Sequence, residues 1–152
     1  MTETRPALVG INHVALEVGD IDAALEFYGR YFRFALRGRG EGRAFIDMGD
    51  QFLALSETSD AHRDVRRHFG LVVDDREGLR ARMEADGVTF VSENRFDFLD
   101  PWGNRVEVVA YPDIQFLKAR GVLAHLGQEG LRKSDGALRE LCGKGIEPPE
   151  DS

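Results

Sequence analysis

Two eight-residue segments of the chain resemble each other: HVALEVGD at 13–20 and HFGLVVDD at 68–75. In each segment a histidine leads, apolar residues alternate behind it, and an aspartate follows seven positions after the histidine. Matched spacing of this kind indicates internal duplication. Because 152 residues with 42% hydrophobic content can bury one substantial core, we expect residues 1–152 to form a single domain built from two similar halves.

The first half, residues 9–57, has the hydrophobic pattern of alternating strands and one helix. Asp20 can cap this helix, whose apolar residues recur at helical spacing, and a Gly-rich turn at 37–42 follows it. The first half therefore predicts the order β-α-β-β-β. The hydrophobic pattern locates three of the four strands, at 11–18, 43–48 and 51–57, and the helix at 21–32.

The second half, residues 68–111, restarts this order after a polar connector at 58–67 that lacks regular apolar spacing. A charged helix at 76–86 is stopped by a glycine, and strand-like segments surround a turn at 101–104. Residues 112–152 lie outside the repeat and form a tail. Two helices are expected there, at 113–126 and 134–142, packed on the rest of the chain or on a partner subunit.

The repeat also selects two of the four histidines, because His13 and His68 open equivalent strands. If the halves pair around a pseudo-twofold axis, these histidines can approach each other. Glu107 is an acid in the middle of the apolar segment RVEVVAY, where an unpaired charge would be costly. Two imidazoles and one carboxylate suit Fe, Mn, Zn, Co or Ni as a divalent cation, so we predict one metal site held by His13, His68 and Glu107.

Other interpretations remain open for each of these residues. Either histidine alone is more commonly a hydrogen-bonded strand residue, and Glu107 alone suits a salt bridge. The candidate groups around the metal ligands are also compatible with purely structural roles: Asp47, Asp97, Tyr111 and Arg95. A rival hypothesis is a non-catalytic binding protein, whose aromatic cavity would be lined by Phe45, Phe52, Phe96, Phe98 and Trp102. A third is a protein–protein module acting through the tail.

Charge and hydropathy exclude several classes of partner. The net charge is −7 and positive residues are dispersed among acidic ones, so no basic stripe is present to bind nucleic acid. No apolar run approaches the roughly 20 residues that cross a bilayer. We therefore expect a cytoplasmic protein that binds a small molecule. Cys142 is a lone cysteine in a polar setting, so cysteine chemistry is not expected.

The segments INHVALEVGDIDAALEFY, HFGLVVDD and FLDPWGNRVEVV together resemble the vicinal oxygen chelate superfamily over about residues 9 to 111. This superfamily includes glyoxalases, extradiol dioxygenases and fosfomycin- and bleomycin-resistance proteins. The resemblance implies an α+β fold in which two βαβββ modules form an incomplete eight-stranded barrel, commonly as a homodimer. It also places a divalent cation on His13, His68 and Glu107, where the metal would chelate two substrate oxygens and stabilise an oxyanionic intermediate.

The sequence departs from several members of that superfamily. Glyoxalase I has a further acidic or amide ligand on the last strand of its first module, where this chain has Phe52, Leu53 and Ala54. Extradiol dioxygenases have a tyrosine where Asp97 stands. The basic residues of fosfomycin-resistance enzymes have few counterparts, since only Arg95 and Arg105 are near. We therefore expect an enzyme with a three-ligand site whose reaction (lyase, isomerase, thiol transferase or dioxygenase) the sequence leaves open.

Overall fold

The computed structural model describes residue 11, residues 13–49 and residues 51–148. The first module forms a four-stranded sheet in the order β1-β4-β3-β2, in which β1 runs parallel to β4 and the other pairs are antiparallel. One helix, α1, covers this sheet. The elements are β1 (His13–Val18), α1 (Ile21–Tyr31), β2 (Leu36–Gly40), β3 (Arg43–Asp47) and β4 (Phe52–Glu57).

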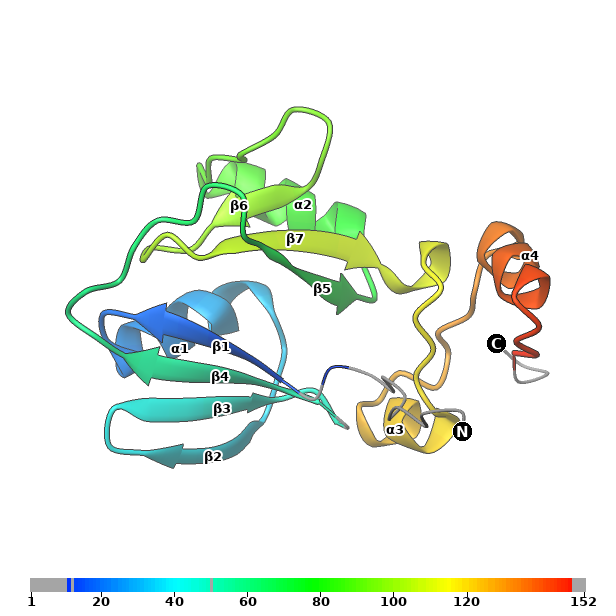
Figure 1. The fold of residues 1–152 in the computed structure, drawn as a ribbon, viewed down its shortest axis with the longest axis horizontal. Helices are drawn as coiled ribbons and strands as arrows, with labels where there is room; N and C mark the ends of the chain where they lie inside the picture. The colour runs from blue at the N-terminus through cyan, green and yellow to red at the C-terminus, as the bar shows by residue number, and fades with distance from the viewer. Residues whose placement is uncertain (1–10, 12, 50, 149–152) are drawn as a thin grey trace, which may run out of the picture.

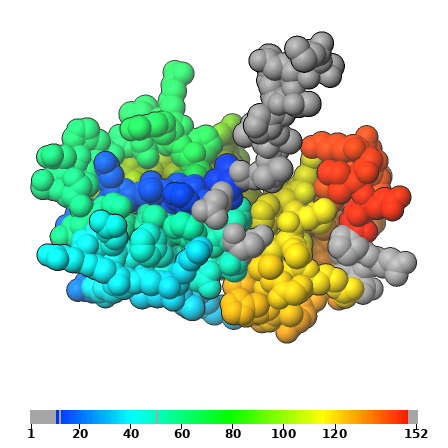
Figure 2. Space-filling model, turned by 60° about the horizontal axis from the view of Figure 1, so that its bottom comes forward, coloured from blue at the N-terminus to red at the C-terminus, as the bar shows by residue number. Residues whose placement is uncertain are grey.

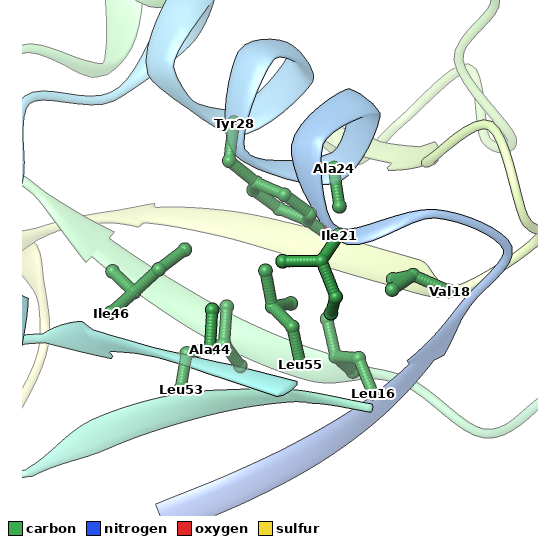
Figure 3. Packing of buried hydrophobic residues seen from close by; sticks show 9 residues of the cluster. All are labelled: Leu16, Val18, Ile21, Ala24, Tyr28, Ala44, Ile46, Leu53 and Leu55. Carbon is green, nitrogen blue, oxygen red and sulfur yellow. The ribbon is translucent and has the colours of Figure 1, made fainter. Parts of the chain in front are cut away.

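Helix α1 begins where the sequence predicts it. The side chain of Asp20 accepts a hydrogen bond from the backbone N–H of Ala23 at 2.7 Å, which satisfies one of the free donors of the first turn. Ile21, Ala24 and Tyr28 form its buried face. Figure 3 shows these side chains directed toward Leu16, Val18, Ala44, Ile46, Leu53 and Leu55 of the sheet. Burial of this apolar face holds the helix on the sheet.

The second module forms a three-stranded sheet in the order β5-β7-β6, with β5 parallel to β7. Its elements are β5 (Phe69–Val73), α2 (Arg76–Ala85), β6 (Asp97–Leu99) and β7 (Arg105–Ala110). The prediction of an α+β fold is confirmed. The predicted eight-stranded barrel is not, because the described residues form seven strands in two separate sheets and no closed barrel.

The missing strand was expected between α2 and β6. There, only an isolated bridge joins Phe90 to Phe98 within the described residues. The backbone N–H and the hydroxyl of Ser92 both donate to the carboxylate of Asp97, at 3.1 Å each, which turns the chain away from the sheet. In the first module the structure contains a strand where a turn was expected. Residues expected as a Gly-rich turn form the exposed edge strand β2.

Both helices lie on the same side of the two sheets, behind the strands in Figure 1. The cores beneath α1 and α2 meet at three shared aromatic residues, Phe27, Phe32 and Phe69. The opposite faces of the two sheets carry no helix (Figure 1). Side chains that point away from α1 and α2 therefore lie on an open surface.

The tail packs on its own chain. It contains the 3-10 turn η1 (Tyr111–Asp113), α3 (Arg120–His125) and α4 (Asp135–Gly143), and buries Leu123, Ala137 and Leu141. Figure 2 shows the tail, in yellow to red, beside the blue and cyan first module. Helix α4 agrees with the prediction, but α3 is much shorter than the expected helix at 113–126. No helix of the described part of the chain combines the length and the apolar character that crossing a bilayer needs.

The shortening of α3 has a local cause. Lys133 is only 6% exposed, and its ammonium group donates hydrogen bonds to the backbone carbonyls of Tyr111 and Ile114. These carbonyls would otherwise accept hydrogen bonds from a continuing helix. The ammonium group also lies 3.5 Å from the centre of the Tyr111 ring, a cation–π contact. Lys133 therefore holds the extended segment between η1 and α3.

Candidate metal centre

Strand β7 places Glu107 on the open face of the second sheet. Val106 and Val108 are buried beneath α2, whereas Glu107 alternates with them and its side chain is 29% exposed. This is the orientation that the alternation of the RVEVVAY segment predicts. Tyr111, one of the groups expected around the metal ligands, does not share this face, because it leaves the strand in η1 and is buried against the tail.

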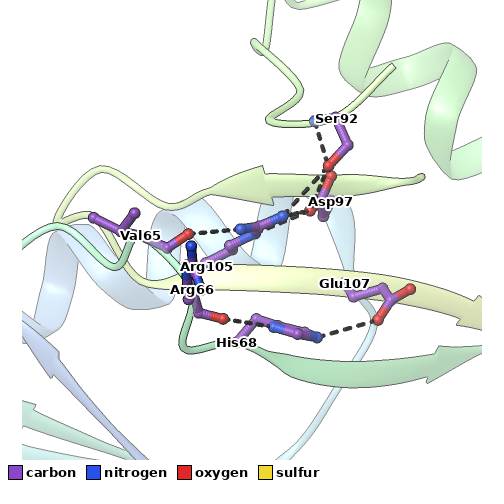
Figure 4. A network of polar contacts seen from close by, with 7 residues as sticks. All are labelled: Val65, Arg66, His68, Ser92, Asp97, Arg105 and Glu107. Carbon is purple, nitrogen blue, oxygen red and sulfur yellow. Dashed lines mark hydrogen bonds and ion pairs between the residues drawn. The ribbon is translucent and has the colours of Figure 1, made fainter. Parts of the chain in front are cut away.

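His68 lies directly before β5 and its ring faces Glu107. The His68 Nε2 atom is 3.6 Å from Oε2 of Glu107, and its Nδ1 atom is 2.9 Å from the backbone carbonyl of Arg66 (Figure 4). A carbonyl only accepts hydrogen bonds, so Nδ1 must carry a proton and donate it. In the neutral ring Nε2 is then the unprotonated nitrogen, with its lone pair toward the carboxylate. This tautomer is the one that binds a cation through Nε2.

His13 lies apart from this pair. It opens β1, is exposed, and stacks on Phe52 with the ring centres 4.7 Å apart and the planes at 11°. Strands β1 and β5 run in opposite directions in Figure 1, so the first residues of the two strands are at opposite ends. Among the residues that the structure describes, no three His, Cys, Asp or Glu side chains form a group able to hold a metal ion. One chain thus brings together His68 and Glu107 but not His13.

An ion pair lies beside Glu107 on the same sheet. Asp97 pairs with Glu107 in the register of β6 and β7, and its carboxylate accepts hydrogen bonds from the guanidinium of Arg105, one of them at 2.9 Å from Nε. Burial alone would raise the pKa of Asp97, but hydrogen bonds from Arg105 and Ser92 outweigh it and lower the pKa. Asp97 therefore binds Arg105 as a carboxylate. Arg105 lies two residues before Glu107 in β7. Residues at this spacing in a strand lie on the same face of the sheet, so the sequence alone indicates that Arg105 and Glu107 are neighbours.

The remaining candidates have different surroundings. Asp47 lies in the same row of the first sheet as Phe52 and His13, and its Oδ2 is 4.0 Å from Nε2 of His125 in the tail. Arg95 is exposed in the loop before β6. The expected aromatic wall does not form one surface: Phe96 and Phe98 belong to the core beneath α2, Trp102 packs on the core beneath α1, and Phe45 lies on Phe52.

A groove with a volume of about 1300 Å³ extends from the second module to the tail. It is bordered by β5 along its length, by the starts of β1 and β4, and by α3 with its flanking segments. His13 and His68 both line it, whereas Glu107 does not. The groove is large enough for a small organic molecule.

Comparison with known proteins agrees with this fold. Residues 10–108 match the model of the Glyoxalase/Bleomycin resistance protein/Dioxygenase superfamily. The chain belongs to this superfamily. It is 30% identical over 114 residues to glutathione transferase FosA of Serratia marcescens, a match that covers 66% of this chain and 80% of that protein.

Two solved structures illustrate the fold. The lactoylglutathione lyase of Agrobacterium tumefaciens is 25% identical, with a TM-score of 0.56, over 69% of this chain and 96% of that chain. The fosfomycin resistance protein FosX of Listeria monocytogenes is 16% identical, with a TM-score of 0.55, over 68% of this chain and 94% of that chain. The superfamily thus includes enzymes. Its shared fold accounts for the two modules and leaves much of this chain outside.

Proposed function

We propose that this protein is a metal-dependent enzyme in which His13, His68 and Glu107 bind one divalent cation. The observation that carries the proposal is the pair formed by His68 and Glu107. Two atoms bound to one cation at about 2.0–2.2 Å, with an angle of about 90–120° at the cation, lie roughly 2.8–3.8 Å apart. The 3.6 Å between Nε2 and Oε2 falls in this range, so the two atoms have the spacing of two ligands of one cation.

The groups around the pair support the same assignment. The Arg66 carbonyl fixes the ring of His68 and keeps its Nε2 atom available. Arg105 donates hydrogen bonds to Asp97 and to the backbone carbonyl of Val65, so Asp97 is the carboxylate that neutralises its positive charge. When bound, a divalent cation would supply a Lewis acid that polarises substrate oxygens and stabilises an oxyanionic intermediate.

We further propose that His13 reaches this pair from a second copy of the chain. His13 and His68 open equivalent strands, yet each chain places them apart. A symmetric dimer, in which each β1 meets the open face of the partner's second sheet, would supply the missing nitrogen twice. The same contact would cover part of the surface that no helix covers.

Mixed dimers test where His13 acts. His13→Ala and Glu107→Gln proteins should each bind almost no cation. After unfolding and refolding together, half of the dimers pair the two variants, and each such dimer rebuilds one complete site. Metal content should then return to about one quarter of the wild-type value per chain. No return of bound cation in the mixture would contradict a site shared between chains.

Activity screens on the metal-loaded protein address the reaction. Glutathione addition to fosfomycin comes first, because the 30% identical relative is a glutathione transferase. Hemithioacetals and catechols under O₂ follow, as lyase and dioxygenase substrates. His68→Ala should abolish any activity found. A second candidate, a non-catalytic resistance-type binding protein, is suggested by the bleomycin resistance proteins in the family's name, and it predicts ligand binding that His68→Ala leaves unchanged.

A further inference from the structure

The tail forms one wall of the groove that His13 and His68 line. Its contribution is mainly apolar, whereas the first module contributes Phe34, Met48 and Phe52 to the same groove. Leu126 is 38% exposed although it is a large apolar residue. Covering such a side chain with an apolar ligand gains free energy in proportion to the area removed from water. The apolar tail residues of this wall are Phe116, Leu123, Leu126 and Leu131, and Tyr111, Lys118, His125 and Gln128 also line the groove.

This wall is fixed to the first module. Lys118 donates a hydrogen bond of 2.9 Å from Nζ to the backbone carbonyl of Met48. Gly49 lies so close to α3 that a Cβ atom there would come within 2.4 Å of Cγ1 of Val122. Both contacts lie at the turn between β3 and β4. Helix α3 therefore has a defined place at the end of the groove.

The tail is also bonded to the second module. Asp74, directly after β5, accepts a hydrogen bond of 2.9 Å from the side chain of Gln128 and one of 2.7 Å from Arg33. These contacts join the tail, the second module and the segment after α1 at one carboxylate. The wall is thus preorganised, which lowers the entropic cost of binding a ligand against it.

The wall lies outside the fold that the superfamily shares. The family model ends at residue 108, and the lactoylglutathione lyase structure is 96% covered while 69% of this chain is covered. Residues 112–148 are therefore an addition to the common modules. Because the apolar end of the groove is formed by this addition, the residues of the tail select which ligand the groove binds.

We propose that the tail builds a specificity wall that binds the apolar body, aromatic or branched aliphatic, of the protein's substrate. The proposal rests on the proposed function, because the groove is bordered by two of the three metal-ligand candidates. It adds the substrate class. His68 precedes β5 and the wall lies at the far end of that strand, roughly 20 Å away at about 3.3 Å per residue, so the substrate would be an elongated molecule with oxygens for the cation at one end and an apolar portion at the other. Most of that portion would contact Phe116, Leu126 and Leu131.

The test uses the uncharged fluorescent probe N-phenyl-1-naphthylamine with the metal-free full-length protein. Leu126→Glu places a charge in the wall and should weaken probe binding at least about tenfold. Ile146→Glu is the matched control, because Ile146 is a tail residue of similar exposure, 42%, that does not line the groove. It should change the affinity less than twofold. Thermal unfolding checks that both variants fold, since both positions are exposed.

The outcomes separate the two proposals. Absence of saturable probe binding, as expected if a second copy fills the groove, overturns the specificity wall. Equal effects of Leu126→Glu and Ile146→Glu overturn it as well. If the wild type binds no cation but Leu126→Glu still weakens probe binding selectively, the metal-dependent function fails and the wall stands. His62→Ala, at a connector histidine that does not line the groove, should leave both probe affinity and metal binding unchanged.

Discussion

The hydroxyl of Tyr28 donates a buried hydrogen bond of 2.9 Å to Oδ2 of Asp100, and this contact joins α1 of the first module to the turn before β7. Asp100 also accepts hydrogen bonds from the backbone N–H groups of Trp102 and Asn104. The Asn104 side chain donates onward to the backbone carbonyl of Glu17, at 2.7 Å. The DPWGN element that marks the superfamily therefore acts here as a joint between modules.

Removing the Tyr28 hydroxyl should loosen this joint. Tyr28→Phe leaves a buried carboxylate oxygen of Asp100 with one fewer donor, and we expect the free energy of unfolding to fall by about 1–3 kcal/mol. Tyr31→Phe, on the same helix and more exposed, should cost clearly less. Urea unfolding of the two variants measures the difference. Equal stability of Tyr28→Phe and the wild type would show that the joint is unimportant.

The Arg105–Asp97 pair predicts a pH dependence. Asp97→Asn leaves the guanidinium of Arg105, 14% exposed, without its carboxylate, and we expect a loss of about 3 kcal/mol at pH 7. Because the folded-state pKa of Asp97 lies below its ordinary value of 3.8, the pair stabilises the fold above that pH and loses this contribution as the pH falls.

The measurement is the difference in unfolding free energy between the wild type and Asp97→Asn. This difference should be constant from pH 5 to 7 and should shrink below about pH 4. Thermal unfolding at each pH provides it. A difference that grows toward acidic pH would mean that Asp97 is not stabilised as a carboxylate.

The sequence predicted the parts of this structure that depend on local patterns. The cap at Asp20 and the spacing of Ile21, Ala24 and Tyr28 predicted α1, and alternation around Glu107 predicted its open face. Strand β2 was missed because it is an exposed edge strand without an apolar face. The relation between His13 and His68 depends on how two modules pack. Such packing rests on contacts between distant residues, and no local pattern reports it.

Lys133 provides a second test by pH. Burial lowers the pKa of Lys133 to about 8, and the charge of Asp113 limits the fall. A lysine whose folded-state pKa is depressed makes the fold more stable as the pH rises from about 8 to 10.5, since the unfolded chain binds more protons there. The slope from this one group is at most about 1.4 kcal/mol per pH unit.

Comparison with Lys133→Met isolates that effect. The free energy of unfolding of the wild type minus that of Lys133→Met should increase between pH 8 and 10.5. Denaturant unfolding at several pH values supplies both curves, and groups common to both proteins cancel. A difference that decreases over this interval would show that the ammonium form is the stabilising one and that its hydrogen bonds outweigh its burial.

The attachment of the tail depends on Gly49. Gly49 has φ +89°, and an added Cβ would meet Val122 at 2.4 Å, so Gly49→Ala should destabilise the protein by about 2 kcal/mol or more. Gly127→Ala is the control, because Gly127 has φ +68° with open space around it and should show only the backbone cost of about 1 kcal/mol.

Shortening the opposing side chain should relieve part of the strain. The double variant Gly49→Ala/Val122→Ala is expected to lose less stability than the sum of its single changes, because the clash is removed. Thermal unfolding of the four proteins completes the cycle. Additive effects, or a Gly49→Ala cost equal to that of Gly127→Ala, would place α3 away from this turn.

His68 and Glu107 are expected to bind a divalent cation together. Titration of metal-free protein with Co²⁺, followed by absorbance and calorimetry, measures stoichiometry and affinity directly. We predict one cation per chain for the wild type and for His62→Ala, a connector histidine outside the site, and at least about 100-fold weaker binding for His68→Ala and Glu107→Gln. Wild-type affinity in His68→Ala and Glu107→Gln, or no stoichiometric binding by the wild type, would contradict the claim.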